Sequence, residues 1–322
     1  MSFKPALYEF PKLFKRLKSQ QNKYVQHFIK LREGKQYRLE QNGVMVQGLK
    51  TIRELRDSGI PLRSLIVTAE ESPFNESAIK FPANQVINNP DAFPADYYYL
   101  INIDLTRRIL GTASKPSRHE IFAEIPIPKH DLPSKDKVDR LLIFNHVNDP
   151  GNLGNLVRTG KALGWDSGVI TTGTCDLYND KTIRASRALS LLWKYEKISI
   201  PELIPFLKEY DMTPVVADML PTESKIKEET NVWSPRTGYY HEQSNPTTIG
   251  SGLWFWNFKK NNNEPYLPKR PALILSSEHN GVKGLDDEIR VSIPMINDVE
   301  SINVASAGSL IMYELNNLIK KE

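Results

Sequence analysis

Apolar and polar positions follow two successive patterns along the chain, separated by a polar stretch near residue 130. Before that stretch, short apolar runs alternate with amphipathic segments. The pattern predicts strands at 44–46, 64–68 and 119–127 and a helix at 49–57. We interpret residues 37–128 as one small α/β domain. Residues 129–139 are charged and contain a proline, which is typical of a linker between domains.

Apolar runs and helical periodicity alternate regularly from residue 140 to the end of the chain. The expected strands are 141–145, 168–171, 214–218, 272–276 and 290–294, and the expected helices are 155–163, 181–193, 201–210 and 304–319. The last helix has an apolar face formed by Val304, Ala307, Ile311, Leu315 and Leu318. This alternation favours a mostly parallel sheet covered by helices on both sides. The fold class is therefore predicted to be α/β, with residues 140–322 as a second domain.

Residues 221–270 interrupt the alternation, and we interpret them as an insertion in the second domain. Among asparagines, glycines and prolines they hold an aromatic group: Trp233, Tyr239, Tyr240, Trp254 and Trp256. One interpretation is a loop that its own aromatic cluster holds in place. The other is a surface on which unpaired RNA bases stack, since Lys259, Lys260 and Arg270 are close in sequence.

The composition is that of a globular protein, and 322 residues suffice for two domains. Apolar residues make up 40% of the chain and charged residues 25%. No apolar run reaches the roughly 20 residues that a membrane-spanning helix requires, so we expect no membrane association. The single cysteine, Cys175, excludes an intrachain disulfide and a thiolate metal cluster. The six histidines are not spaced as metal ligands, and we expect no metal.

The beginning of the chain is basic and poor in acidic residues. The net charge of +4 and the pI near 8.9 fit a polyanionic partner without requiring one. Positive charge is concentrated in the first thirty residues, where Glu9 is the only acid: Lys4, Lys12, Lys15, Arg16, Lys18, Lys23 and Lys30. We interpret residues 1–36 as either an arm that touches RNA or an organelle-targeting segment.

A polar, glycine-containing loop follows the expected strand 141–145 and leads into the next helix. Ligands of parallel sheets bind at the carboxyl ends of the strands, where this loop is expected. Its glycine spacing fits neither a P-loop nor a dinucleotide-binding fingerprint. Arg158 falls early in the expected helix 155–163, where the helix macrodipole disfavours a cation. We therefore interpret Arg158 as facing an anion.

Two further polar turns follow expected strands. The turn at 276–281 begins with Ser276 and contains Glu278. The segment 293–304 begins with Ile293-Pro294-Met295 and ends with Ser301-Ile302-Asn303-Val304, where the last helix starts. Taken singly, each has an ordinary structural explanation, because a carboxylate in a turn and an asparagine at a helix start are routine.

Together and in this order, these segments resemble the three motifs of the SpoU (TrmH) family of RNA 2′-O-methyltransferases. Residues 149–159 resemble its D-P-x-N-x-G-x-x-x-R-[ST] motif. Residues 276–281 resemble G-x-E-x-x-G with serine in the first place, and residues 293–304 resemble I-P-M followed by S-L-N-V and a helix with Glu314. Residues 178–186 and the segment Val46–Lys50 also look like family patterns, the latter in its RNA-binding domain.

The resemblance implies a trefoil-knotted SPOUT domain at 140–322, an L30e-like RNA-binding domain at 37–128, and a homodimer with shared active sites. The cofactor would be S-adenosyl-L-methionine, held largely by main chain at Ser276, Ile293 and Ile302. The substrate would be RNA, and the L30e-like domain resembles the ribosomal-RNA branch. With the basic N-terminus, that branch suggests a mitochondrial enzyme of large-subunit ribosomal RNA, with a cytoplasmic location as the alternative.

The resemblance also assigns roles in methyl transfer to a ribose hydroxyl. Arg158 would hold a phosphate and stabilise the charge that develops on the 2′ oxygen. It is treated as an orienting cation rather than a base, since a guanidinium is always protonated. Asn152 and Asn303 would hold the ribose and the polar end of the cofactor, and Glu278 would order the loops.

The main departure from the family pattern is Ser276, which stands where the family has glycine. A serine fits if the backbone there has an ordinary negative φ, as the continuous strand 272–276 predicts. A positive φ would instead weaken cofactor binding. Two alternatives therefore remain beside an rRNA enzyme: an RNA-binding ribosome-assembly factor with weak or no activity, and a tRNA 2′-O-methyltransferase. A dinucleotide-dependent oxidoreductase is disfavoured by the missing glycine pattern.

Overall fold

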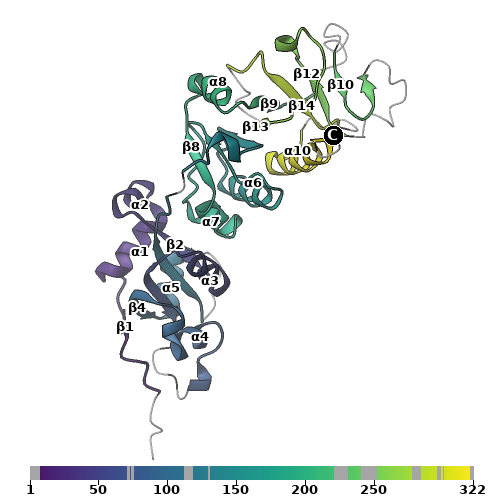
Figure 1. The fold of residues 1–322 in the computed structure, drawn as a ribbon. Helices are drawn as coiled ribbons and strands as arrows, with labels where there is room; N and C mark the ends of the chain where they lie inside the picture. Colours follow the sequence, from purple (N-terminus) through teal and green to yellow (C-terminus); the bar gives the residue numbers. More distant parts are fainter. Residues whose placement is uncertain are drawn as a thin grey trace, which may run out of the picture. The chain divides into compact units, whose positions relative to one another are not determined.

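The computed structural model describes residues 8–70, 73, 76–111, 119–129, 131–220, 231–240, 252–277, 284–295, 299 and 301–319. The chain forms two compact units, which we describe separately. The first comprises residues 1–129 together with 178–191, and the second comprises residues 130–177 together with 192–322. Figure 1 shows both as layers of helices packed against a sheet.

The first unit has a five-stranded sheet in the order β1-β4-β3-β5-β2. Its strands are β1 (Phe14–Arg16), β2 (Gly43–Gln47), β3 (Leu62–Thr68), β4 (Ala95–Ile101) and β5 (Ile121–Pro126). Its helices are α1 (Lys23–Glu33), α2 (Lys35–Gln41), α3 (Leu49–Asp57), α4 (Ala83–Asn88), α5 (Ile103–Leu110) and α7 (Asp180–Ala185). β5 pairs antiparallel with β2 and β3, whereas β4 pairs in parallel with β1 and β3. The expected strands 44–46, 64–68 and 119–127 and the helix 49–57 are confirmed.

Part of the segment expected to be an arm or a targeting segment is folded into this unit. β1 adds to the sheet beside β4, and α1 buries Val25, Phe28 and Leu31 in the core of the unit. Asn22 caps α1 by accepting a hydrogen bond from the backbone N–H of Tyr24. The interpretation of residues 1–36 as a separate segment is therefore wrong from β1 onward. The two lysines of α1, Lys23 and Lys30, are exposed and made this segment appear basic in the sequence, although its other face is apolar.

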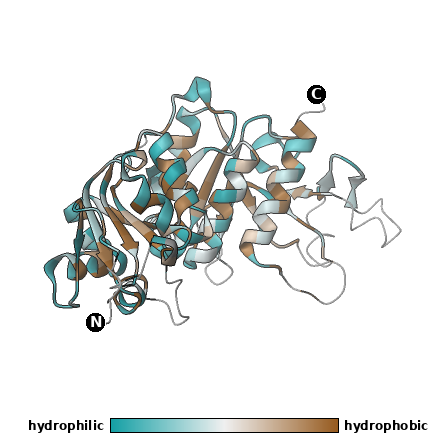
Figure 2. Ribbon diagram, turned by 90° about the horizontal axis from the view of Figure 1, so that it is seen from below, coloured by the Kyte–Doolittle hydropathy of each residue, from teal (hydrophilic) through white to brown (hydrophobic). Residues whose placement is uncertain are grey.

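The second unit has a nine-stranded sheet among its described residues, in the order β11-β10-β12-β14-β9-β13-β6-β7-β8. Its strands are β6 (Leu141–Asn145), β7 (Ser167–Ile170), β8 (Lys194–Lys197), β9 (Thr213–Ala217), β10 (Trp233–Ser234), β11 (Gly238–Tyr239), β12 (Trp254–Trp256), β13 (Pro271–Ser276) and β14 (Ile289–Ser292). Its helices among the described residues are α6 (Pro150–Ala162), α8 (Ile200–Glu209) and α10 (Val304–Ile319). The strands from β14 to β8 are parallel, as expected, and Figure 2 shows their hydrophobic residues inside the layers.

The helix expected at 181–193 is shorter in the structure. α7 ends at Ala185, and the chain continues as a 3-10 turn at Leu189–Leu191. Arg187 and Ala188 separate the two with φ angles of 51° and 63°. A left-handed backbone at two successive non-glycine residues ends a right-handed helix, and apolar periodicity alone does not reveal it.

The described part of the insertion at 221–270 extends the sheet. β12 pairs antiparallel with β14, and β10 pairs with β11 and β12. Trp254 and Trp256 are buried in a small core with Val232, against which Leu220 and Tyr240 pack. The interpretation as a segment held by its own aromatic cluster is confirmed for these residues. Because their rings are buried, the two tryptophans offer no surface on which bases could stack.

Candidate active site

The first motif forms the start of α6 rather than a loop before it. Asp149 caps the helix by accepting a hydrogen bond from the backbone N–H of Asn152 at 2.7 Å, and Pro150 occupies the first turn. Because α6 begins at Pro150, Arg158 lies in its second half. The argument that the macrodipole disfavours a cation at Arg158 is therefore wrong. The interest of Arg158 depends on its surroundings instead.

Arg158 lies in an open groove between α6 and α10. The groove has a volume of about 700 Å³. Its walls are Asn155, Arg158, Thr159, Ala162 and Leu163 on one side and Asn303, Ala305, Ser306, Ser309 and Leu310 on the other. The side chain of Arg158 is exposed, and within the described part of the chain it forms no ion pair. This guanidinium is available to an anionic ligand.

Asn303 joins the two helices that form the groove. Its side-chain oxygen caps α10 by accepting hydrogen bonds from the backbone N–H groups of Ala305, at 2.9 Å, and Ser306, at 3.4 Å. Its side-chain nitrogen donates to the side-chain oxygen of Asn152 at 3.0 Å. Asn303 is thus both a helix cap and a link to the first motif. The structure brings Asn152, Arg158 and Asn303 together on adjacent helices.

Ser276 lies at the carboxyl end of the central strand β13, next to Asn145 at the end of β6. The hydroxyl of Ser276 accepts a hydrogen bond from the side-chain nitrogen of Asn145 at 2.9 Å. The oxygen of the same buried amide accepts from the Thr171 hydroxyl at 2.7 Å and lies 2.9 Å from Nδ1 of His146. Four side chains thus form one polar layer across the ends of β6, β7 and β13. Asn145 is not among the predicted site residues, although an asparagine that ends a buried strand is an informative signal.

The backbone of Ser276 has no positive φ, unlike that of the neighbouring His146, whose φ is 52°. The prediction that the serine occupies an ordinary extended position is confirmed. The adjacent Ser277 hydroxyl is buried and has no hydrogen-bond partner among the described residues. A buried polar atom without a partner is costly, so this hydroxyl suits a polar ligand at the strand end. These residues therefore fit S-adenosylmethionine.

The remaining predicted site residues are distributed as follows. Ile293 directly follows β14 and Ile302 precedes the cap of α10, and both are half-buried. No interaction between either residue and Ser276 is defined within the described part of the chain. Glu278 lies outside the described residues. Their roles stay predictions.

Gly308 fixes the spacing between the helices and the sheet behind the groove. A β-carbon at this position would come within 2.6 Å of Leu156 in α6 and 2.7 Å of Leu275 in β13. A larger residue would require these leucine side chains to shift. The glycine therefore allows α10 to pack closely against both α6 and β13.

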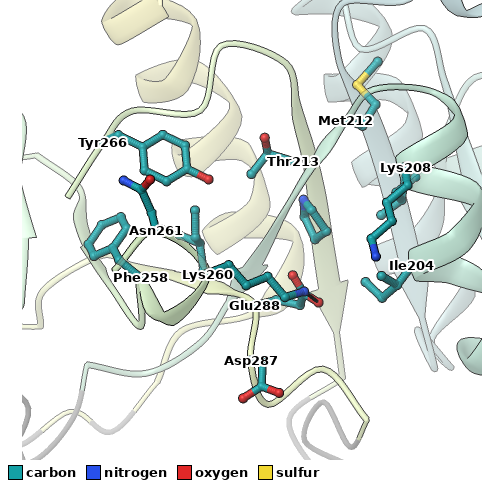
Figure 3. Close-up of a pocket in the computed structure, with 13 residues that line it drawn as sticks. Ile204, Lys208, Met212, Thr213, Phe258, Lys260, Asn261, Tyr266, Asp287 and Glu288 are labelled. Atoms are coloured by element: carbon teal, nitrogen blue, oxygen red, sulfur yellow. Dashed lines mark hydrogen bonds and ion pairs between the residues drawn. The ribbon is translucent and has the colours of Figure 1, made fainter. Parts of the chain in front are cut away.

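A second cavity, of about 190 Å³, lies at the opposite ends of the strands, beside the first residues of β9 and β14. Figure 3 shows Lys260 and the buried Glu288 meeting as an ion pair between the ring of Tyr266 and the chain of Lys208. Burial raises the pKa of Tyr266, so this phenol stays protonated. None of the predicted site residues lines this cavity.

The described part of the chain lacks both a cluster of metal-ligating side chains and a membrane-spanning helix. It contains no group of three or more histidine, cysteine, aspartate or glutamate side chains that could hold a metal ion. None of its helices is both long and apolar enough to cross a bilayer.

A parallel sheet with a polar layer at its strand ends and an unpaired arginine beside it defines a class of ligand-binding α/β domain, and comparison with known proteins specifies the family. The sequence model described as "SpoU rRNA Methylase family" matches residues 139–313. The chain therefore belongs to the SpoU rRNA methylase family and is a methyltransferase that uses S-adenosylmethionine.

Similar proteins support this placement. The chain is 24% identical to the Bacillus subtilis 23S rRNA (guanosine(2553)-2′-O)-methyltransferase RlmP, over 94% of its own length and 99% of that protein. It is 22% identical to rRNA methyltransferase 3, mitochondrial, of Xenopus tropicalis, over 91% and 74% of the two lengths. The AdoMet-bound rRNA methyltransferase of Sinorhizobium meliloti has the same fold, with a TM-score of 0.67 at 17% identity over 95% and 99% of the two chains.

Proposed function

We propose that this chain transfers a methyl group from S-adenosylmethionine to a ribose 2′-hydroxyl of ribosomal RNA. The observation that carries the proposal is the exposed, unpaired Arg158 in a groove shared with Asn303, which is hydrogen-bonded to Asn152 of the first motif. Relatives named as rRNA methyltransferases at nearly full length support ribosomal RNA as the substrate.

S-adenosylmethionine, when bound, supplies a methyl group already activated by the sulfonium. The protein then has to position the ribose and stabilise the charge that develops on its oxygen. Arg158 binds an RNA phosphate through its planar fork and places positive charge near that oxygen. Asn152 and Asn303, fixed by their mutual hydrogen bond, hold the ribose and the polar end of the cofactor. Glu278 orders the turn that follows Ser276.

The cofactor site lies at the carboxyl ends of β13 and β14. Ser276, Ile293 and Ile302 present main-chain groups there, and Ser277 adds a buried hydroxyl. We further propose that the chain forms the trefoil knot of its family in this region. An experimental structure with an unknotted backbone would contradict this proposal.

The proposal is tested with the purified chain, labelled S-adenosylmethionine, and ribosomal and transfer RNAs as substrates. We expect micromolar cofactor binding and a labelled 2′-O-methyl group in ribosomal RNA. Mapping of 2′-O-methyl sites in cells with and without the gene then identifies the nucleotide. If only tRNA is labelled, the substrate is tRNA and not ribosomal RNA. If calorimetry detects no binding of S-adenosylmethionine, the assembly-factor alternative is favoured.

We also propose a homodimer whose interface includes α6 and α10. Leu310 and Tyr313 are large side chains with exposures of 52% and 58% on α10, and Leu310 lines the Arg158 groove. A second copy would cover this surface and bring its own cofactor site to Arg158. Mixing Arg158→Ala chains with chains that cannot bind the cofactor should restore activity if the Arg158 groove of one subunit and the cofactor site of the other form one active site. An active monomer in light scattering would refute the dimer.

We propose a mitochondrial location, supported by relatives named rRNA methyltransferase 3, mitochondrial, in several vertebrates. Similarity to the bacterial RlmP supports the cytoplasmic alternative equally directly. Cleavage of a leader beyond β1 would remove a strand of the first unit, so we expect that segment to stay in the mature protein. Imaging a C-terminally tagged full chain with a mitochondrial marker separates the two locations.

A further inference from the structure

The first unit carries an aromatic and basic surface that the methyl-transfer site does not use. Tyr97 on β4 stacks on Tyr99 with ring centroids 6.4 Å apart and an angle of 23° between the rings. Tyr99 in turn contacts Tyr24 of α1 at 5.2 Å. Tyr99 is buried, Tyr24 is half-buried, and Tyr97 is 58% exposed. The three rings therefore form a row that runs from the core to solvent.

Lysines surround the exposed part of this row. Lys15 of β1 lies opposite Tyr99 in the sheet, and its ammonium group is 5.4 Å from the centre of the Tyr24 ring. Lys23 approaches the same ring at 5.1 Å. Two helical turns further along α1, Lys30 lies 5.7 Å from the ring of Tyr37. The three lysines and the tyrosines Tyr24 and Tyr97 form what we call the β1–α1 surface.

Among the described residues, the three lysines of the β1–α1 surface form no ion pair with a carboxylate. Asp96 lies next to Tyr97 in the strand, and by strand alternation it belongs to the opposite face, with Tyr98 and Phe14. A polyanion could therefore approach without displacing an ion pair.

The part of this surface around Tyr97 and Lys15 lies apart from the segment through which the first unit resembles an RNA-binding domain. Val46–Lys50 spans the end of β2 and the start of α3, whereas β1 forms the other edge of the five-stranded sheet. A ligand on the β1–α1 surface would thus be held in addition to contacts at Val46–Lys50.

We propose that the β1–α1 surface binds an unpaired segment of the RNA substrate, with a base stacked on Tyr97 and phosphates at Lys15, Lys23 and Lys30. An exposed ring face accepts any base, and flexible lysines suit a backbone of repeated negative charge. A duplex hides its base faces, so it cannot use Tyr97. The proposal rests on the proposed function for its choice of RNA and deepens it by naming the single-stranded form.

The test measures binding of a short unstructured RNA oligonucleotide by the full chain, by fluorescence anisotropy over a range of salt concentrations. Tyr97→Leu should weaken binding about five-fold or more while leaving the salt dependence unchanged, because stacking is lost and no charge is removed. Tyr97→Phe keeps the ring and should bind like the wild type. Tyr97 is mostly exposed, so neither change should lower the melting temperature.

Lys23→Ala should instead lower the slope of log K against log salt by about 0.7, the contribution of one phosphate on a single strand. Lys80→Ala, at an exposed lysine elsewhere in the first unit, is the matched control and should leave affinity and slope unchanged. A duplex of the same sequence should bind with an affinity that Tyr97→Leu does not alter.

Two outcomes would overturn the proposal: unchanged binding of single strands by Tyr97→Leu and Lys23→Ala, or equal losses in Lys80→Ala. The first would point to a protein partner for this surface. Methyl transfer to ribosomal RNA is measured in parallel. If the variants lose RNA affinity but the wild type never methylates RNA, the surface stands and the proposed function fails. If methylation proceeds but the variants bind normally, only the surface proposal fails.

Discussion

The parallel strands β14 to β8 have polar side chains at both their amino ends and their carboxyl ends. The two ends differ in whether those side chains find hydrogen-bond or ion-pair partners within the protein. At the amino ends, Lys260 pairs with the buried Glu288 inside a small cavity. At the carboxyl ends, the buried Ser277 hydroxyl has no hydrogen-bond partner among the described residues, and Arg158, on helix α6, forms no ion pair among them. The Lys260–Glu288 pair satisfies its own charges, whereas the Ser277 hydroxyl and the Arg158 guanidinium are left to bind a ligand. Polar groups that lack a partner within the protein, rather than charge or an enclosed cavity, therefore mark the candidate functional site.

The largest difference between the two ends of the strands is expected on substitution of Arg158. Arg158→Ala should reduce methyl transfer at least about a hundred-fold, as loss of a group that stabilises transition-state charge does. Cofactor affinity and melting temperature should be nearly unchanged, because the side chain is exposed and acts on RNA. Arg158→Lys should also be poor, since an ammonium lacks the planar fork. A rate for Arg158→Ala within a few-fold of wild type in a single-turnover assay would refute the assigned role.

At the amino ends, Lys260→Ala should change stability and not chemistry. It leaves the Glu288 carboxylate buried without its partner, which should cost about 1–3 kcal/mol in the free energy of unfolding by urea. The rate of methyl transfer per folded molecule should stay at the wild-type value. Lys259→Ala is the matched control, because its ion pair with Asp287 is exposed at both ends and should contribute less than about 1 kcal/mol. A rate lost in Lys260→Ala but not in Lys259→Ala would mean that the cavity takes part in catalysis.

Asn303 allows its two roles to be separated by a pair of substitutions. Asn303→Ala should lose both the cap, about 1 kcal/mol, and the bond to Asn152. Asn303→Asp keeps the oxygen that caps α10 but cannot donate to Asn152. Stability should therefore fall only in the alanine variant, while methyl transfer falls about ten-fold in both, as for a misplaced binding group. Thermal melting and initial rates on the same preparations decide this, and full activity in Asn303→Asp would make the bond to Asn152 dispensable.

The smallest effect is expected at Ser276. Ser276→Gly should change S-adenosylmethionine affinity by no more than about two-fold, because the backbone already has a φ that suits serine. Isothermal titration calorimetry measures this directly. Undetectable binding by the wild type that Ser276→Gly restores would show that the site has decayed, and would favour the assembly-factor alternative.

Sequence periodicity located the strands and the last helix of the site, because each strand is a short buried apolar run and the helix has a regular apolar face. Leu141–Asn145 and Val304–Ile319 agree with the structure at both ends. The start of α6 could not be located in the same way, because its first turn is Pro150, Gly151 and Asn152, which also suit a loop. The error moved Arg158 from the second half of the helix to its beginning. Local residue preference does not distinguish a capped helix from a turn when the cap itself is the polar motif.

Side-chain partnerships were the other part that sequence could not supply. Asn303 was expected to be either a helix cap or a site residue. Its side-chain oxygen caps α10, and its side-chain nitrogen donates to Asn152 of the first motif, so it serves both roles. Asn145 is far from Ser276 along the chain, and only the parallel pairing of β6 with β13 brings them together. The tryptophans of the insertion could have faced either way, and β12 is buried on joining β14. Long-range pairing decides each of these cases.

The buried amide of Asn145 has a practical consequence for spectroscopy. Its nitrogen donates to Ser276 and its oxygen is held by Thr171, so its two protons should exchange slowly with solvent and give a resolved side-chain signal in a ¹⁵N-correlated NMR spectrum. Ser276 stands where the methyl donor is expected, so that signal should shift when the donor binds, in the absence of RNA and of turnover. Asn316, whose amide donates to the Leu163 carbonyl near the other end of α10, supplies a reference signal that should stay in place. One spectrum would thereby report whether the methyl donor is bound at the carboxyl ends of the strands, and the donor itself would need no label.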